Sequence, residues 1–254
     1  MTKIKAKYID IHPSVKIGSN VNINCEKISI GRCSILLDNI NIQCRELEIG
    51  EYLFMANGVE IGRGGNTGPN SKVKIGNGVG IFENTMINPS ESIEIGDETG
   101  IGAEVMIWTH GAWLDIVQGF PAGFGPVQIG KNVWLPARSI VLPNVTIGDN
   151  VVVGINSIVN RSLPDGCLAA GLPCKVIKEN MYPKKLNDEQ IEEMVKGIIS
   201  DWLVLIKAKG VTRTIDINYK NNKIILNQGY EQTIYNIIDK TIEGETNNVS
   251  EDLR

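Results

Sequence analysis

The sequence predicts an all-β solenoid built from six-residue units. Aliphatic residues recur at every sixth position through the middle of the chain, at Ile129, Leu135, Val141, Ile147, Val153 and Val159. The same spacing appears upstream, and the aliphatic residue that opens a set is usually followed by glycine, as in Ile49-Gly50. A helix is excluded, because its 3.6-residue period scatters positions six apart around the axis, and because glycine and β-branched residues lower helix propensity.

Each six-residue unit is expected to form one short strand followed by a bend, with its aliphatic side chain pointing inward. Three units close one coil of about 18 residues, the separation between Ile129 and Ile147. Because a single coil cannot bury its own inner face, the coils must stack through main-chain hydrogen bonds at about 4.8 Å.

The upstream elements follow the same spacing in shorter sets, each of which restarts after an insertion. The sets are Ile17 and Ile23; Ile30, Leu36 and Ile42; Ile49, Met55 and Ile61; Ile75, Ile81 and Ile87; and Ile95, Ile101 and Ile107.

Two insertions are long enough to carry a function, because insertions in a solenoid project from a rigid platform. The first, Arg63 to Lys72, is polar and rich in glycine. No helix start follows it, so it indicates a surface loop rather than a phosphate-binding loop. The second, Trp108 to Pro126, holds the aromatic residues Trp108, Trp113, Phe120 and Phe124. A monomer would not readily expose that apolar area, and we expect this loop to pack over a neighbouring subunit.

The motifs around the second insertion resemble those of a known family. Ile129-Gly130-Lys131-Asn132-Val133-Trp134 follows the insertion, and Gly171-Leu172-Pro173-Cys174-Lys175-Val176-Ile177-Lys178 closes the repeat. Over about residues 10 to 178 the chain resembles the hexapeptide-repeat acyltransferases, and its motifs are most similar to those of the galactoside and maltose O-acetyltransferases. The resemblance implies a left-handed parallel β-helix, an exception to the right-handed crossover rule.

The resemblance also implies the roles of individual residues. The chain has two histidines, His12 and His110. His110 matches the general base that precedes the insertion in this family. Trp134, Ala137 and Ile155 match the acetyl-CoA groove, where the last two offer backbone groups to the pantetheine arm. Arg161, Lys175 and Lys178 match positions near the nucleotide phosphates, and their positive charge suits that role. Leu135-Pro136 replaces the family's Ile-Gly, and proline has no amide donor to offer.

For the acceptor, the resemblance points to Asn84, on a strand that faces the sugar in sugar O-acetyltransferases. Asn84 could equally stabilise a turn, and Trp113 could stack on a sugar ring or fill a subunit interface. The implied function is an acetyl-CoA-dependent O-acetyltransferase acting on a sugar or surface-polysaccharide precursor. It would work by direct transfer as a homotrimer with active sites between subunits. An amino-sugar N-acetyltransferase and a non-catalytic scaffold remain alternatives, whereas two histidines cannot supply the three metal ligands of a γ-type carbonic anhydrase.

Net charge, the absence of long apolar runs and the cysteine count limit the binding partners and the cellular compartment that we expect. A net charge of -4 gives no electrostatic reason to bind nucleic acid or an anionic membrane. The chain shows no leader-like segment and no apolar run long enough to span a bilayer, so we expect a cytoplasmic protein. The five cysteines are an odd number without a metal-type CxxC motif, which indicates free thiols that fill coil interiors and no bound metal.

The organisation predicted is a β-helix domain over residues 1–180, with the inserted loop at 108–126, and a small α+β appendage over 181–254. Asn187-Asp188-Glu189-Gln190 indicates a helix start, and Ile191 to Ile206 carry an apolar stripe at helical spacing. Residues 214–226 read as a β-hairpin, Ile234, Ile237 and Ile238 as a short helix, and Glu243 to Arg254 as a disordered polar tail. The appendage could select the acceptor or stabilise the oligomer.

Overall fold

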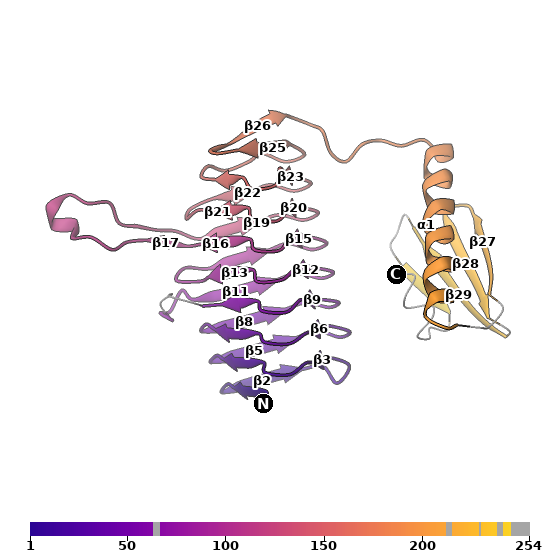
Figure 1. The fold of residues 1–254 in the computed structure, drawn as a ribbon, viewed down its shortest axis with the longest axis horizontal. Coiled ribbons are helices and arrows are strands. Elements are labelled where there is room, and N and C mark those ends of the chain that lie inside the picture. The colour runs from indigo at the N-terminus through magenta and orange to yellow at the C-terminus, as the bar shows by residue number, and fades with distance from the viewer. Residues whose placement is uncertain (63–66, 212–214, 229, 238–240, 245–254) are drawn as a thin grey trace. The chain divides into compact units, whose positions relative to one another are not determined.

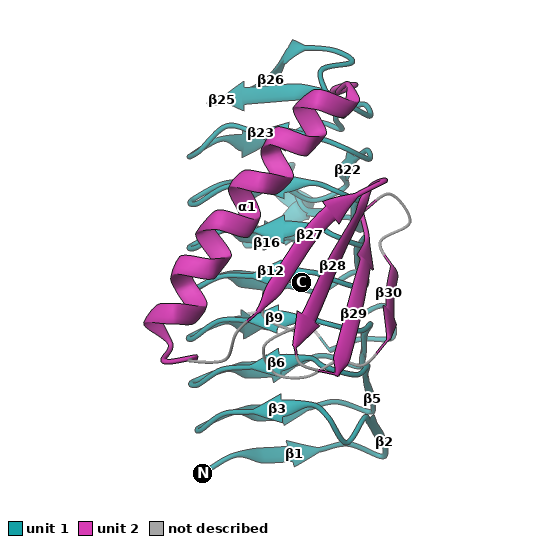
Figure 2. Ribbon diagram, turned by 90° about the vertical axis from the view of Figure 1, so that its right-hand side faces the viewer, with its two compact units in different colours: residues 1–183 teal, residues 184–254 magenta. Residues whose placement is uncertain are grey.

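The computed structural model describes residues 1–62, 67–211, 215–228, 230–237 and 241–244. It divides the chain into two compact units, Met1–Pro183 and Lys184–Arg254 (Figure 2). Each unit has its own hydrophobic core.

The first unit is a parallel β-helix with three faces, which we name sheets A, B and C (Figure 1). Sheet A contains β1 Lys3–Lys5, β4 Asn22–Asn24, β7 Asn41–Gln43, β10 Glu60–Ile61, β13 Met86–Asn88, β16 Met106–Trp108, β21 Ile140–Val141 and β24 Ile158–Val159. Sheet B contains β2 Tyr8–Ile11, β5 Lys27–Ile30, β8 Glu46–Ile49, β11 Lys72–Ile75, β14 Ile93–Ile95, β19 Val127–Ile129 and β22 Thr146–Ile147.

Sheet C completes each coil. It contains β3 Lys16–Ile17, β6 Ile35–Leu36, β9 Phe54–Met55, β12 Gly80–Ile81, β15 Gly100–Ile101, β20 Trp134–Leu135, β23 Val152–Val153, β25 Leu168–Gly171 and β26 Cys174–Lys178. The chain visits A, B and C in turn and pairs each strand in parallel with its counterpart one coil away, apart from β26, which turns back antiparallel to β25. The predicted all-β solenoid is therefore confirmed.

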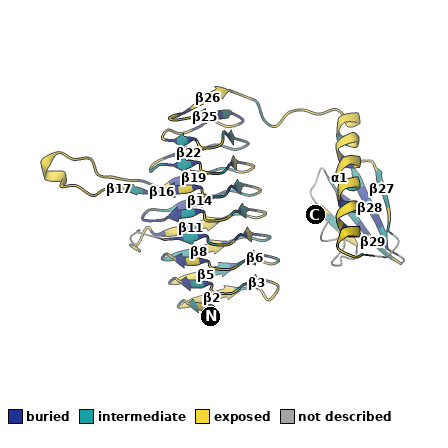
Figure 3. Ribbon diagram, in the orientation of Figure 1, coloured by how far each residue is buried: buried dark blue, intermediate teal, exposed yellow. Residues whose placement is uncertain are grey.

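The inward residues of the six-residue repeat form one continuous core (Figure 3). Ile107 stacks on Ile87 and Val141, and all three side chains are buried. Since every coil covers the inner face of the next, each coil is stabilised by its contacts with the two coils beside it.

Two of the three corners turn tightly, and the third does not. At the C–A corner the chain turns through a left-handed residue in successive coils, among them Asn84, Glu104, Arg138 and Asn156. The B–C corner repeats this device with, for example, Asn132 and Asn150, because asparagine tolerates positive φ better than most residues. Both insertions follow a sheet A strand and precede a sheet B strand, and the second leaves the β-helix at this A–B corner as a hairpin (Figure 1). Residues 63–66 of the first insertion lie outside the described residues.

Glycines after the sheet B strands let neighbouring coils approach closely at the B–C corner. A Cβ added to Gly96 would lie 2.7 Å from the backbone carbonyl carbon and oxygen of Gly130 in the next coil. The Ile-Gly pairs seen in the sequence therefore serve coil stacking.

The second unit is one helix and a four-stranded antiparallel sheet. Helix α1, Asp188–Ala208, begins after Asn187, whose side chain accepts from the Gln190 N–H while the Gln190 side chain accepts from the Asn187 N–H. The sheet contains β27 Asp216–Lys220, β28 Lys223–Gln228, β29 Glu231–Asn236 and β30 Thr241–Gly244. Trp202 and Ile206 of the helix share a core with Leu226 and Tyr235 of the sheet.

The short helix predicted from Ile234, Ile237 and Ile238 was wrong. Ile234 lies in β29, where Thr233 and Tyr235 alternate inward and the strand pairs with β28 on one side and β30 on the other. Strand pairing outweighed the helical spacing, and Ile238 lies outside the described residues. Glu243 of the predicted tail lies in β30, and residues 245–254 are not described.

Among the described residues, no helix has both the length and the apolarity that crossing a bilayer requires.

Candidate active site

His110 lies where the second insertion leaves the A–B corner. It follows β16, and with Gly111 it forms β17, which pairs antiparallel with β18, Gly123–Phe124. The two strands are the base of a hairpin that projects from the β-helix (Figure 1). Near its tip lies the 3₁₀ helix η1, Ile116–Gln118, which begins after Asp115, whose carboxylate accepts from the Val117 N–H.

A buried amide orients the imidazole of His110. Its Nδ1 lies 2.8 Å from Oδ1 of Asn88 and 3.1 Å from Oγ of Ser90. Asn88 is 0% exposed and Ser90 6% exposed. Because an amide oxygen can only accept a hydrogen bond, Nδ1 carries the proton and Nε2 keeps its lone pair. His110 is therefore held in the tautomer that a general base at Nε2 needs.

Neighbouring contacts fix this pair. The Ser90 hydroxyl donates to Asn88 Oδ1 at 3.3 Å. The Thr109 hydroxyl donates to the Asn88 carbonyl at 2.6 Å and accepts from the Glu91 N–H at 3.0 Å. These bonds join two successive coils beneath the imidazole.

Aromatic rings flank the imidazole. Phe124 stacks on it with 5.7 Å between ring centroids and an interplanar angle of 18°, and Trp108 meets it edge-on at 6.0 Å. Phe124 lies opposite His110 in the hairpin register, so the hairpin positions this ring. The arrangement can accept a proton from a hydroxyl or an amine that reaches Nε2.

Sequence reasoning missed Asn88 and Ser90. The available signal was the coil register: Asn88 ends β13 and pairs with Trp108 of β16, two residues before His110. Stacking the predicted coils in register would have placed a polar side chain beneath the imidazole.

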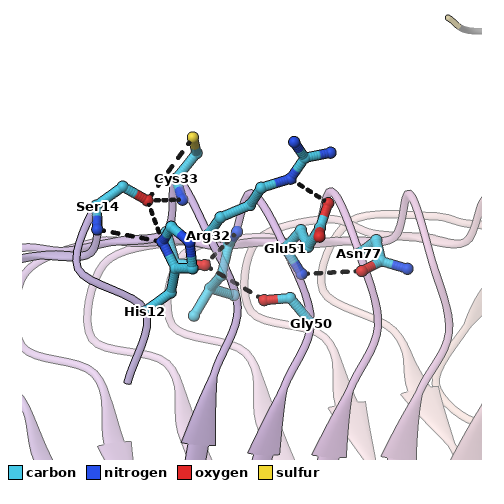
Figure 4. Close-up of polar contacts among 9 residues, drawn as sticks. His12, Ser14, Arg32, Cys33, Gly50, Glu51 and Asn77 are labelled. Atoms are coloured by element: carbon cyan, nitrogen blue, oxygen red, sulfur yellow. Dashed lines mark hydrogen bonds and ion pairs between the residues drawn. The ribbon is translucent and has the colours of Figure 1, made fainter. Parts of the chain in front are cut away.

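The second histidine, His12, has a different setting at the B–C corner (Figure 4). Its Nδ1 lies 2.9 Å from the Ser14 hydroxyl, and both residues are exposed. Cys33, one coil further on, donates its N–H to that hydroxyl at 2.8 Å and is a half-exposed turn residue with positive φ. The prediction that the cysteines fill coil interiors is therefore wrong for Cys33, because its side chain points out of a tight corner.

The predicted donor-side residues lie on sheet C and at the C–A corner. The Trp134 ring covers Gly100, which has no Cβ to obstruct it, and meets Phe82 edge-on with centroids 6.4 Å apart. Ala137 and Ile155 occupy equivalent places in successive turns, and the Ala137 carbonyl accepts from the Asn156 N–H at 3.1 Å. Ile155 is exposed.

The three predicted phosphate-binding cations are exposed at the last coil. Arg161 follows β24 at the A–B corner, whereas Lys175 and Lys178 lie on β26. Thus Arg161 and the two lysines lie on different parts of that coil.

The predicted acceptor residues are also separate from His110. Asn84 is an exposed turn residue of the C–A corner, with φ of 56°. Trp113 is 95% exposed in the projecting hairpin. In a single chain, His110 therefore lies at one corner, and Trp134, Ala137, Ile155 and Asn84 lie on another face or corner.

Among the described residues there is no group of three or more His, Cys, Asp or Glu side chains placed to hold a metal ion.

Comparison with known proteins accounts for the repeat. The family described as bacterial transferase hexapeptide (six repeats) matches residues 126–161, from the end of the hairpin through β24. This segment is a bacterial transferase hexapeptide repeat. The hexapeptide segment includes Trp134, Ala137 and Ile155, and it ends at Arg161.

A curated relative of this chain is the galactoside O-acetyltransferase of Escherichia coli (strain K12), which is 50% identical over 54 residues. The match covers 21% of this chain and 27% of the relative. The chain thus spans about a quarter of that relative's length, and 36% of the next relatives, from Staphylococcus aureus.

The fold extends further than this sequence similarity. The crystal structure of the polysialic acid O-acetyltransferase OatWY superposes with a TM-score of 0.56 at 19% identity, covering 71% of this chain and 89% of that one. The predicted left-handed parallel β-helix is therefore confirmed.

Proposed function

We propose that this protein is an acetyl-CoA-dependent O-acetyltransferase that acetylates a hydroxyl of a sugar or surface-polysaccharide precursor. The observation that carries the proposal is the imidazole of His110, whose Nδ1–H is held by Asn88 so that Nε2 is left with its lone pair. The similarity of part of the chain to a galactoside O-acetyltransferase supports the acetyl group and the sugar acceptor.

In this mechanism Nε2 of His110 takes the proton of the acceptor hydroxyl while the oxygen attacks the thioester carbonyl. The acetyl group forms a new ester bond, the carbon–sulfur bond breaks, and the imidazolium returns the proton to the departing thiolate. Asn88 supports the charged imidazole, because the Nδ1–H hydrogen bond strengthens when the ring becomes positive. No acyl-enzyme forms in this sequence of steps.

The donor would bind along sheet C and the C–A corner, with Trp134 beside the thioester end and Lys175 and Lys178 near the phosphates. The exposed Ile155 turn and the exposed lysines of β26 support that path. Arg161 would approach the phosphates from the A–B side of the last coil.

We further propose that the active site is completed by a second copy of the chain in a homotrimer. His110 and the donor-side residues lie at different corners of one β-helix, so a corner of one subunit must face another corner of its neighbour. The hairpin supports this assembly, because Trp113, Ile116 and Val117 leave a large apolar area exposed. Trp113 and Asn84 are the acceptor contacts in this scheme.

The cytoplasm is the proposed compartment. All five cysteines are free thiols in the structure, which fits a reducing environment.

The test is the variant His110→Ala, assayed by thiol release from acetyl-CoA with hydroxyl-bearing and amine-bearing sugars. We expect kcat to fall by about 10²-fold to 10⁴-fold, the usual share of a general base. Acetyl-CoA should still raise the thermal unfolding temperature of the variant, because His110 takes no part in the donor groove. His12→Ala is the matched control and should keep full activity, since His12 is exposed at another corner.

A near-normal kcat in His110→Ala would refute the assignment of the base. Activity with amine acceptors alone would change the product to an N-acetyl sugar. Silence with every acceptor, together with no thermal shift by acetyl-CoA, would indicate a scaffold.

A further inference from the structure

Two cysteines lie one above the other in the N-terminal coils of the β-helix. Cys25 follows β4 and Cys44 follows β7, and the preceding residues Asn24 and Gln43 pair in register. Their Sγ atoms are 3.6 Å apart. Cys25 is 9% exposed and Cys44 2% exposed, so the pair lies just beneath the A–B corner with Cys25 nearer to solvent.

The backbone geometry at this position suits a covalent link. Neighbouring strands of a sheet lie about 4.8 Å apart, which falls inside the range of Cα separations, about 4.4 to 6.8 Å, seen in disulfides. The backbone is fixed on the far side as well, since the Cys25 N–H donates to the Lys5 carbonyl at 3.0 Å. The sulfur atoms need to approach by about 1.5 Å, which side-chain rotation can supply.

We propose that Cys25 and Cys44 form a peroxide-sensitive dithiol that two-electron oxidation converts into a disulfide between adjacent coils. The Cys25 thiolate attacks one oxygen of hydrogen peroxide, the oxygen–oxygen bond breaks, and Cys25 becomes a sulfenic acid while hydroxide leaves and takes up a proton as water. The Cys44 thiol then attacks the sulfenic sulfur, the sulfur–sulfur bond forms, and a second water departs. Two thiols and one peroxide thus give one disulfide and two waters.

The roles within the pair follow from the hydrogen bonds. The Cys44 S–H has two acceptors in reach, the Cys25 sulfur at 3.6 Å and the Glu46 carbonyl at 3.5 Å. A thiolate is the stronger acceptor, so the S–H turns to Cys25 when that sulfur ionises. This hydrogen bond lowers the pKa of Cys25 and raises the pKa of Cys44, and burial raises that of Cys44 further. Cys25 is therefore the attacking thiolate and Cys44 the resolving thiol.

The other cysteines of the chain are internal controls. Cys167 and Cys174 are both buried, and burial is the main reason that the pKa of each is raised. Their thiols should therefore react slowly with peroxide. Cys33 is half-exposed at the B–C corner, so its oxidation shows how an accessible thiol without a paired cysteine reacts under the same conditions.

The experiment treats the full-length protein with hydrogen peroxide, blocks the remaining thiols with an alkylating agent, and maps the peptides by mass spectrometry without reduction. We expect a linked peptide that joins Cys25 to Cys44, two hydrogen atoms lighter than the sum of its parts. It should be the most abundant cysteine pairing, because the Sγ atoms of Cys25 and Cys44 already lie 3.6 Å apart. Dithiothreitol should restore both thiols.

Variants and the wild-type map together keep the test decisive. Cys25→Ser and Cys44→Ser should each abolish the linked peptide, whereas Cys33→Ser should leave it unchanged. Circular dichroism checks that the variants fold. If one does not, the peptide map of the wild-type protein still tests the proposal. The proposal is overturned if peroxide oxidises Cys33 in the wild type while Cys25 and Cys44 remain thiols, or if both become separate sulfinic acids without linking. Neither outcome depends on acetyltransferase activity.

Discussion

At the scale of single residues, the Asn88 amide decides which nitrogen of His110 can accept a proton. It is fully buried, its Oδ1 also accepts from the Ser90 hydroxyl, and the Asn88 backbone carbonyl accepts from the Thr109 hydroxyl. The tautomer with a proton on Nδ1 is therefore already fixed in the free protein. The proposed base at Nε2 needs no rearrangement when the acceptor binds.

Replacing Asn88 tests this positioning role. In Asn88→Ala the Nδ1–H loses its acceptor, so we expect kcat to fall by about 10-fold to 100-fold, a part of the general-base share. The KM for acetyl-CoA should change little. In Asn88→Asp the acceptor remains and carries a negative charge that favours the imidazolium, so activity should persist while the acid limb of the pH–rate profile moves to higher pH. Steady-state kinetics across pH measures both effects, and equal losses in the two variants would assign Asn88 a purely structural role.

His110 could be proposed from the sequence because it stands at the mouth of an insertion, where the hexapeptide-repeat acyltransferases that the chain resembles have their general base. Asn88 and Ser90 could not be found from the six-residue spacing alone, because their contacts with His110 join adjacent coils across 22 and 20 positions. Asn77 and Asp97 of adjacent coils are 20 positions apart, whereas Lys131 and Asp149 are 18 apart. The contact with Asn88 appears only when the repeats that contain Ile87 and Ile107, 20 positions apart, are stacked in register.

At the scale of elements, close coil contact at the B–C corner depends on glycine. Gly96→Ala puts a methyl group 2.7 Å from the Gly130 carbonyl, and we expect this overpacking to lower the free energy of unfolding by about 1 to 3 kcal/mol. Gly111→Ala is the matched control, because a Cβ there meets nothing within 4 Å. Urea titrations followed by circular dichroism compare the two, and equal stability would show that the corner can widen without loss.

The strands of the β-helix could be predicted because aliphatic residues such as Leu135 and Val141 recur at six-residue steps within each set, and the structure buries both side chains. Strands β29 and β30 escaped prediction. Their inward positions include Thr233, and no aliphatic alternation marks them. The hairpin arms β17 and β18 are short and exposed apart from His110, so no periodic pattern could reveal them.

At the scale of the whole molecule, the two hydrophobic cores have no residue in common within the described part of the chain. We therefore expect a chain that ends at Pro183 to fold by itself, since every coil finds its neighbours within the first unit. The truncated protein should keep the strand-dominated circular dichroism spectrum and the thermal shift with acetyl-CoA. A spectrum of an unfolded chain would show instead that the second unit is needed for the β-helix to form. If the truncated chain folds but loses acceptor turnover or the oligomer, the second unit has the corresponding role.

The hairpin that carries His110 shows that the A–B corner tolerates a long insertion. Val133 and Thr99 bond across 34 positions because the hairpin intervenes, compared with 18 between Lys131 and Asp149. The entropic cost of closing a loop grows only with the logarithm of the number of residues it contains, by about 0.6 kcal/mol for each doubling. Segments of very different size can therefore be exchanged at this corner with little penalty to folding, leaving the platform beneath them unaltered.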